Sequence, residues 1–174
     1  MDKKKYEALC FRAKAGDILL KITRSEMEIG MKNVLFIASE AVPFIKTGGL
    51  ADVVGALPKY FNKDEFDVRV MIPKYTCIPW EYREKMVYKT HFYIDLAWRT
   101  QYVGVFEMEY QGVTFYFIDN EFYFSGFAPY DGDPKWNIEK FSFFCKAVLS
   151  ILPVIGFRPD LIPVSYTHLT LPTT

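Results

Sequence analysis

Apolar positions along the first half of the chain follow the spacings of strands and helices. Residues 34–38 form a continuous apolar run of the length expected for a buried strand. After a loop, apolar side chains recur at helical spacing and predict one buried helix face, made by Leu50, Val53, Val54, Leu57 and Phe61. Pro58 removes an interior hydrogen bond, so we expect this helix to kink or end early. Residues 66–73 predict a second strand, and strand, helix and strand together indicate a parallel crossover unit.

The second half of the chain predicts mainly antiparallel strands. Residues 87–96, 102–110 and 113–119 have the pattern of extended segments. Gln111-Gly112 lies between the last two and is typical of a tight hairpin turn. These segments are expected to form the edge of the same sheet.

A second helix is expected near the end of the chain. Asn137 is its predicted cap, and Glu139 lies in the first turn, where a carboxylate suits the helix dipole. Its predicted buried stripe consists of Phe141, Phe144, Cys145, Val148 and Leu152. The whole pattern predicts an α/β fold: a Rossmann-like parallel sheet with helices on both faces and some antiparallel edge hairpins.

The loop between the first strand and the first helix carries the candidate chemistry. Lys46 precedes the pair Gly48-Gly49, which opens the predicted helix. Unpaired amides at a helix start favour anions, and paired glycines let a ligand approach the main chain. The alternative is that the glycines only make a tight turn and that Lys46 is a solvated charge.

Other nucleotide-binding motifs do not fit this loop. A dinucleotide fingerprint would require glycine at the positions of Leu50 and Val53. A Walker A loop places its lysine after the glycines, whereas Lys46 comes before them. With these two motifs excluded, the strand, the glycine pair and the helix predict a site suited to a sugar diphosphate.

Composition narrows the classes of partner. The 174 residues carry 21 basic and 21 acidic side chains, so no net field attracts nucleic acid. The three cysteines are far apart and there are only two histidines, which argues against a disulfide framework and a metal centre. No metal or cofactor is expected. The most apolar segment, 141–157, is too short and too interrupted to span a membrane, and a cytoplasmic location is expected.

The same loop carries a family resemblance. Ser39-Glu40, Pro43 and residues 46–53, Lys-Thr-Gly-Gly-Leu-Ala-Asp-Val, resemble the opening signature of bacterial glycogen synthases and plant starch synthases. These are retaining glucosyltransferases of the two-domain GT-B type. The resemblance implies an incomplete N-terminal GT-B domain. It also implies transfer of glucose from ADP-glucose to the non-reducing end of an α-1,4-glucan.

The resemblance also assigns roles to residues. Lys46, Gly48 and Gly49 would bind the ADP-glucose donor. Asp52 and Tyr130 would contact the acceptor glucan, although Asp52 in a first helical turn is equally explained as a dipole partner. Glu40 and Pro43 would shape the loop. No residue of this chain is assigned as catalytic.

The two ends look foreign to this domain. Residues 1–30 are expected to be an N-terminal extension or a miscalled start, and 31–162 a partial N-terminal starch synthase domain. Residues 163–174 lack apolar periodicity and are interpreted as a non-native tail, a sequencing artefact. The isolated chain is therefore expected to be inactive. The alternatives are a non-catalytic nucleotide-sugar or sugar-binding module, or a related GT-B transferase that uses UDP-sugars.

Overall fold

A five-stranded sheet organises the chain in the computed structural model, which describes residues 30–126, 128–130 and 132–163. Its strands are β1 Lys32–Ile37, β2 Phe66–Pro73, β3 Val87–Leu96, β4 Arg99–Tyr110 and β5 Val113–Asp119, in the spatial order β1-β2-β5-β4-β3. The pairs β1–β2 and β2–β5 are parallel, whereas β5–β4 and β4–β3 are antiparallel. The expected mixed sheet, parallel with antiparallel edge hairpins, is confirmed.

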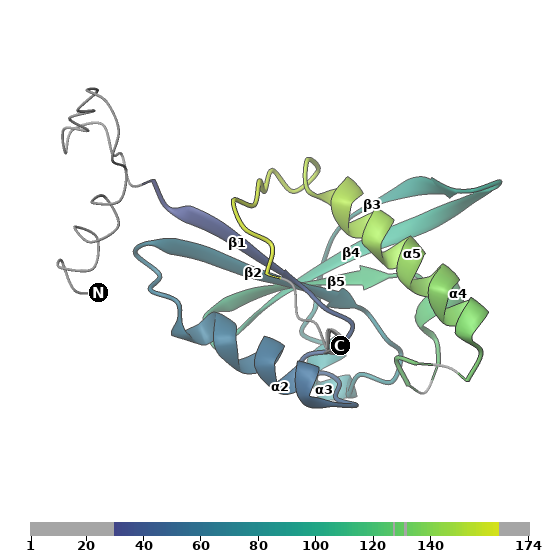
Figure 1. Ribbon diagram of the computed structural model, residues 1–174, viewed down its shortest axis with the longest axis horizontal. Coiled ribbons are helices and arrows are strands. Elements are labelled where there is room, and N and C mark those ends of the chain that lie inside the picture. Colours follow the sequence, from purple (N-terminus) through teal and green to yellow (C-terminus); the bar gives the residue numbers. More distant parts are fainter. Residues whose placement is uncertain (1–29, 127, 131, 164–174) are drawn as a thin grey trace, which may run out of the picture.

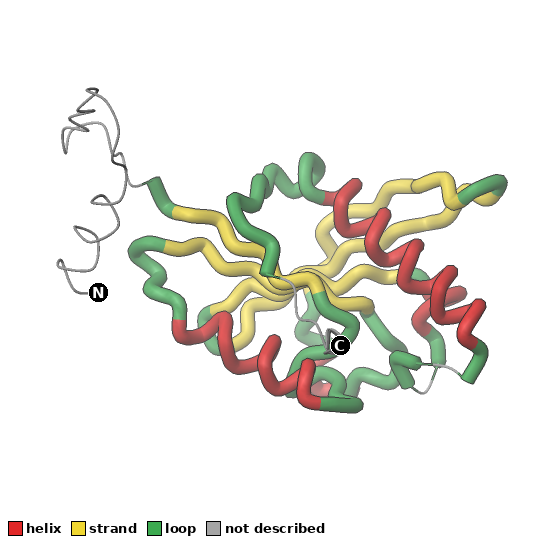
Figure 2. The backbone as a smooth tube through the Cα atoms, in the orientation of Figure 1, coloured by secondary structure: helices red, strands yellow, loops and turns green. Residues whose placement is uncertain are grey.

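Helices cover both faces of this sheet (Figures 1 and 2). The helices are α2 Gly49–Ala56, the 3₁₀-helix η2 Leu57–Tyr60, α3 Trp80–Arg83, α4 Glu121–Phe124 and α5 Pro134–Ile151. Phe61, after η2, contacts Phe66 of β2 with its ring centroid 5.3 Å away. Phe157, after α5, lies 4.1 Å from the guanidinium of Arg69. Because Phe66 and Arg69 are three positions apart in β2, they face opposite sides of the sheet.

The chain returns to β1 after α5, as the yellow segment of Figure 1 shows. Leu161 forms a parallel bridge to Val34, and the Leu35 amide donates to the Leu161 carbonyl at 3.0 Å. Asp160 accepts a 2.8 Å hydrogen bond from the Asn33 amide. Both flanks of β1 are therefore paired. The predicted extension, residues 1–30, and the predicted tail, 163–174, lie almost wholly outside the described residues.

The first predicted helix is present, and its predicted buried face is partly wrong: Val54 is buried and Leu50 and Phe61 pack against the core, but Val53 and Leu57 do not. The helix buries Ala51, Val54 and Gly55, whereas Val53 and Leu57 are 47% and 44% exposed. A Cβ on Gly55 would come within 2.5 Å of the Val42 carbonyl oxygen, so the small residues form the contact face. The helix stops at Ala56, and Pro58 lies in η2, which confirms the early end.

The last helix begins earlier than predicted. Asp133 is its cap and accepts a 2.9 Å hydrogen bond from the Lys135 amide, while Asn137 lies inside the first turn. An aspartate followed by proline is a stronger start signal than an isolated asparagine. The buried stripe is also rotated, because it consists of Lys140, Phe143, Phe144, Ala147, Val148 and Ile151. Cys145, expected in the stripe, is exposed.

Two tight turns define the antiparallel strands. Gln111 and Gly112 have φ values of 52° and 75°, and they join Tyr110 to its partner Val113, as predicted. A second tight turn at Ala97-Trp98 joins Leu96 to Arg99, so β4 begins three residues before the predicted 102. Ala97 has a φ of 54° although it is neither glycine nor asparagine, so its residue type did not indicate a turn.

Candidate functional site

A buried carboxylate holds the loop that follows β1. Glu40 is 2% exposed, and its Oε2 accepts a 2.6 Å hydrogen bond from the Thr47 hydroxyl as well as one from the Thr47 amide. Its other carboxylate oxygen lies 3.6 Å from the position that a Cβ on Gly48 would occupy. Glu40 therefore ties the start of the loop to its end and fixes the approach to the glycine pair.

Phe44 anchors the middle of the same loop. Its ring is 2% exposed and lies edge-on to four aromatic rings, with centroids 5.0–5.5 Å away, those of Tyr82, Tyr110, Phe115 and Phe117. The Val42 amide also donates to the Ala51 carbonyl at 3.1 Å, which links the loop to α2. The loop is therefore packed into the core on one side.

The glycine pair opens α2. Gly48 caps the helix in an extended conformation, without a side chain to bind the first amides, and Gly49 is the first helical residue. Nothing lies within 4 Å of a Cβ placed on Gly49. The start of α2 therefore has no side-chain cap and open space beside Gly49, as an anion site requires.

Lys46 and Asp52 form an ion pair across this opening. The Lys46 Nζ lies 2.7 and 2.8 Å from the two carboxylate oxygens of Asp52. Both side chains are more than half exposed, and such pairs contribute little to stability. The predicted donor-binding lysine and the predicted acceptor-binding aspartate therefore neutralise each other here, and little free energy is needed to separate them.

Tyr130 reaches the same loop from the segment between α4 and α5. Its hydroxyl lies 2.6 Å from the Ser39 Oγ, although 91 positions separate the two residues. Its ring is 48% exposed and lies 5.6 Å from the ring of Phe141 on α5. The structure thus brings Lys46, Gly48, Gly49, Asp52 and Tyr130 to one edge of the sheet.

Four further polar residues at this edge had no predicted role in the site. Lys74 follows β2, and its Nζ lies 3.0 Å from the carboxylate of Asp119, at the end of β5. The next residue, Asn120, is 4% exposed, caps α4 through the Tyr123 amide and donates to the Tyr102 carbonyl at 2.8 Å. Ser39 holds Tyr130. Each comes at or soon after the carboxyl end of a parallel strand, and that position is the signal that could have identified them.

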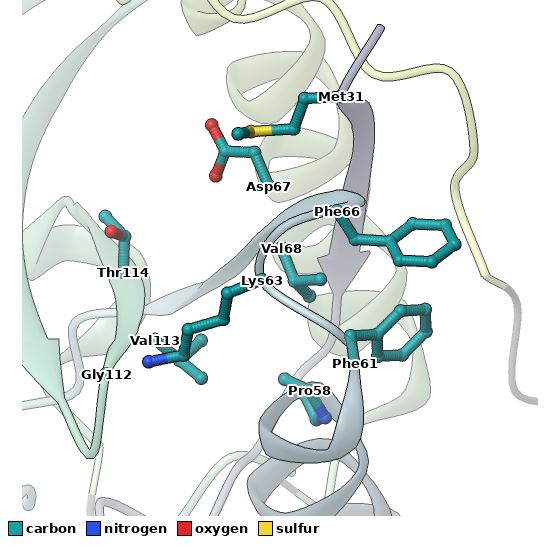
Figure 3. A pocket seen from close by; sticks show the side chains of 10 residues that line it. All are labelled: Met31, Pro58, Phe61, Lys63, Phe66, Asp67, Val68, Gly112, Val113 and Thr114. Atoms are coloured by element: carbon teal, nitrogen blue, oxygen red, sulfur yellow. The ribbon is translucent and has the colours of Figure 1, made fainter. Parts of the chain in front are cut away.

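A hollow at the opposite end of the sheet is a poorer candidate. It has a volume of about 190 Å³, and Figure 3 shows Lys63 extending across it toward Gly112 while Phe61 and Phe66 close one side. Its acidic residue, Asp67, is bound to Arg69 at 2.8 Å. The hollow lies at the amino ends of β1 and β2, away from the carboxyl edge where α/β sheets bind ligands.

Other kinds of site find no support among residues 30–126, 128–130 and 132–163. No cluster of histidine, cysteine and acidic side chains in these ranges could hold a metal ion, and Cys77 and Cys145 are free thiols. Within the same ranges, no helix has the length and apolar character needed to cross a membrane.

Comparisons with known proteins agree on one family. Residues 33–165 match the family model of the starch synthase catalytic domain. Over 132 residues the chain is 81% identical to a glycogen synthase of Lachnospira eligens, and over 132 residues it is 64% identical to that of Lachnoclostridium phytofermentans. Each alignment covers 76% of this chain and 27% of the relative, so the chain spans about a quarter of these relatives' length.

A solved structure supports the fold. The catalytic domain of starch synthase IV from Arabidopsis thaliana, bound to ADP and acarbose, matches with a TM-score of 0.60 and 26% sequence identity. The match covers 76% of this chain and 27% of that one, and it confirms the expected likeness to part of a GT-B fold. The chain therefore belongs to the glycogen and starch synthase family of glycosyltransferases.

Proposed function

We propose that this chain is part of a glycogen synthase polypeptide that transfers glucose from ADP-glucose to the non-reducing end of an α-1,4-glucan, with retention at the anomeric carbon. The observation that carries the proposal is the convergence of Lys46, the start of α2 and Tyr130 at the carboxyl edge of the sheet. It occurs in a chain 81% identical to a glycogen synthase. The ADP held by the Arabidopsis structure favours an adenine nucleotide as the donor's leaving group.

Lys46 and the start of α2 would act on the leaving group. In the transfer, the bond from the glucose C1 to the diphosphate oxygen breaks and a bond from C1 to an acceptor hydroxyl oxygen forms. The diphosphate gains negative charge, and the acceptor proton leaves with it or to solvent. Lys46 would leave Asp52 and bind the diphosphate, which stabilises the transition state more than the ground state.

Asp52 and Tyr130 would bind the acceptor. Once Lys46 turns to the diphosphate, the Asp52 carboxylate is free to accept hydrogen bonds from glucan hydroxyls. Tyr130 presents a half-exposed ring and a hydroxyl beside Ser39, which suits the apolar face and the hydroxyl rim of a sugar. Donor and acceptor groups would thus approach each other across the Lys46–Asp52 pair.

We further propose that the 174-residue chain does not catalyse the transfer alone, because it matches about a quarter of its relatives. In this proposal residues 31–162 are the family domain, the flanking residues add no catalytic group, and the intact enzyme works in the cytoplasm on soluble glucan.

The test is a chimera in which residues 31–162 replace the matching segment of the Lachnospira eligens enzyme. We expect glucose transfer from ADP-glucose to glycogen, much slower transfer from UDP-glucose, and no transfer by the isolated chain. Lys46→Ala should lower kcat about 100-fold, the scale of losing one transition-state donor.

Lys63→Ala is the matched control, because Lys63 is an exposed lysine at the opposite end of the sheet. It should leave kcat unchanged. An inactive chimera that is folded, or a chimera whose Lys46→Ala variant keeps full kcat, would refute the proposal. Faster transfer from UDP-glucose would refute the choice of donor.

A further inference from the structure

Four aromatic side chains gather on one face of the β3–β4 hairpin. They are Tyr88, His91, Tyr93 and Tyr102, here called the hairpin platform. Tyr93 and Tyr102 are cross-strand partners. Neighbouring ring centroids lie 5.7–6.4 Å apart, and the rings of Tyr88, His91 and Tyr102 are within about 32° of parallel from one to the next.

These four rings do not form the buried core on which the hairpin packs. The opposite face of the hairpin supplies the buried residues, including Ile94, Val103 and Val105. Tyr93 is 62% exposed and Tyr88 49% exposed, so much ring surface is left in contact with water. Exposed clusters of aromatic side chains mark interaction sites more often than isolated exposed residues do.

The backbone makes room for the platform. A Cβ on Gly104 would lie 2.7 Å from the Tyr102 hydroxyl and 3.0 Å from its ring, so Tyr102 lies over this glycine. Gly104 is the cross-strand partner of His91, whose ring stacks on Tyr102 at 5.7 Å. A larger residue at position 104 would therefore displace the central ring of the platform.

Hydrogen-bonding groups lie at the tips of the rings. The Tyr88 hydroxyl is 2.6 Å from the His91 Nδ1. Burial, together with the nearby Asp119 carboxylate, raises the pKa of Tyr102, which keeps its hydroxyl protonated and able to donate. Lys74 and Asp119, the charged side chains that approach this face at Phe106 and Gly104, are paired at 3.0 Å, so they place no net charge beside the rings.

The platform is continuous with the carboxyl edge of the sheet. The Tyr102 carbonyl accepts a hydrogen bond from Asn120, which directly follows β5. Tyr88 contacts Phe106, and Phe106 in turn lies 4.3 Å from the Nζ of Lys74. A chain-like ligand that leaves the candidate site along this face would therefore reach the platform.

We propose that the hairpin platform binds a neutral α-glucan chain away from the reaction loop. The pyranose C–H faces would stack on the exposed rings, and sugar hydroxyls would exchange hydrogen bonds with the tyrosine and histidine tips. Because the charges that approach the platform are paired, an uncharged saccharide is favoured over a polyanion. The choice of an α-linked glucan rests on the proposed function.

The test is the retention of the 174-residue chain in native gels that contain glycogen, with hydroxyethylcellulose as the β-linked comparison. We expect retention by glycogen only. Tyr93→Leu should weaken it about fivefold, because leucine keeps apolar volume but lacks the flat ring, and Tyr93→Phe should retain most of it. Because Tyr93 is mostly exposed, both variants should fold, which circular dichroism would verify.

Tyr60→Leu is the matched control, since Tyr60 is 85% exposed on η2, outside the hairpin. It should leave retention unchanged. Absence of retention, equal retention by both polymers, or full retention by Tyr93→Leu would overturn the proposal. Transfer by the chimera is measured separately, so an inactive chimera with a Tyr93-dependent retention would count against the proposed function alone.

Discussion

Single residues decide how the loop and α2 fit together. Glu40 is a buried carboxylate with two hydrogen bonds from Thr47, and a buried charge is stable only when it is bound in this way. Gly55 of α2 packs against Val42 of the loop, so the helix lies directly on the loop at this point. The position of the glycine pair therefore depends on one buried acid and one small residue.

Gly55→Ala should destabilise the protein. Alanine is the better helix former by about 1 kcal/mol, but its Cβ would lie 2.3 Å from the Val42 Cγ2 and 2.5 Å from the Val42 carbonyl oxygen. Overpacking of this kind costs about 1–3 kcal/mol, so we expect a net loss of up to about 2 kcal/mol in the free energy of unfolding. Urea denaturation measures it.

Gly49→Ala provides the comparison, because nothing lies within 4 Å of a Cβ at that position. It should leave the free energy of unfolding unchanged or raise it by up to about 1 kcal/mol. Equal stabilities of the two variants would contradict the packing argument.

At the scale of elements, capping decides where the helices begin. α5 begins with Asp133 as cap and Pro134 as first residue, and α4 begins with Asn120 as cap. The buried face of α5 follows instead from the spacing of its apolar side chains, since residues three and four positions apart lie on one side of a helix. On this face Phe143 stacks on Tyr123 at 4.6 Å.

Asp133→Ala should lower the free energy of unfolding by about 1 kcal/mol, because it removes the acceptor for the Lys135 amide. Asp133→Asn keeps an equivalent cap and should recover most of this stability. Thermal unfolding of the three proteins tests the prediction. If Asp133→Asn is as unstable as Asp133→Ala, capping is not the cause.

At the scale of the whole molecule, buried phenols join strand to strand and helix to helix on the α5 side of the sheet. The Tyr116 hydroxyl of β5 accepts a 2.9 Å hydrogen bond from Arg69, and the Tyr123 hydroxyl of α4 donates to Glu139 of α5 at 2.9 Å. Burial raises the pKa of Tyr116, and burial together with Glu139 raises the pKa of Tyr123 to about 12. Both groups are held neutral in the fold.

Stability should therefore decrease in alkaline solution. An unfolded tyrosine has a pKa of about 10, so above that pH the unfolded chain loses protons that the folded chain keeps. The free energy of unfolding is unaffected by these groups below pH ~10 and falls as pH rises toward the Tyr123 pKa of about 12. Urea titrations at several pH values between 9 and 12 measure the slope.

Tyr123→Phe should make this slope shallower while lowering stability at neutral pH by about 1 kcal/mol through the lost hydrogen bond. A slope identical to that of the unchanged protein would mean that Tyr123 does not contribute to the alkaline loss.

The sequence by itself determined the order of the elements and the composition of the reaction loop. The pattern of apolar residues predicted the observed bounds of β2, β3 and β5, because side chains alternate between the two faces along any strand. Gln111-Gly112 predicted its turn because few residues adopt positive φ. The spacing of Lys46, Gly48, Gly49 and Asp52 along the chain also ensured that these residues would lie together at the start of one helix.

Only the tertiary structure decided which faces are buried and which distant residues meet. The sequence could not predict that α2 packs through Ala51 and Gly55, because that choice depends on how closely Val42 approaches. The contact of Tyr130 with Ser39, the Lys74–Asp119 pair and the hairpin platform likewise join residues that are far apart in the chain or on different strands. Such contacts depend on sheet order and register, which local periodicity does not specify.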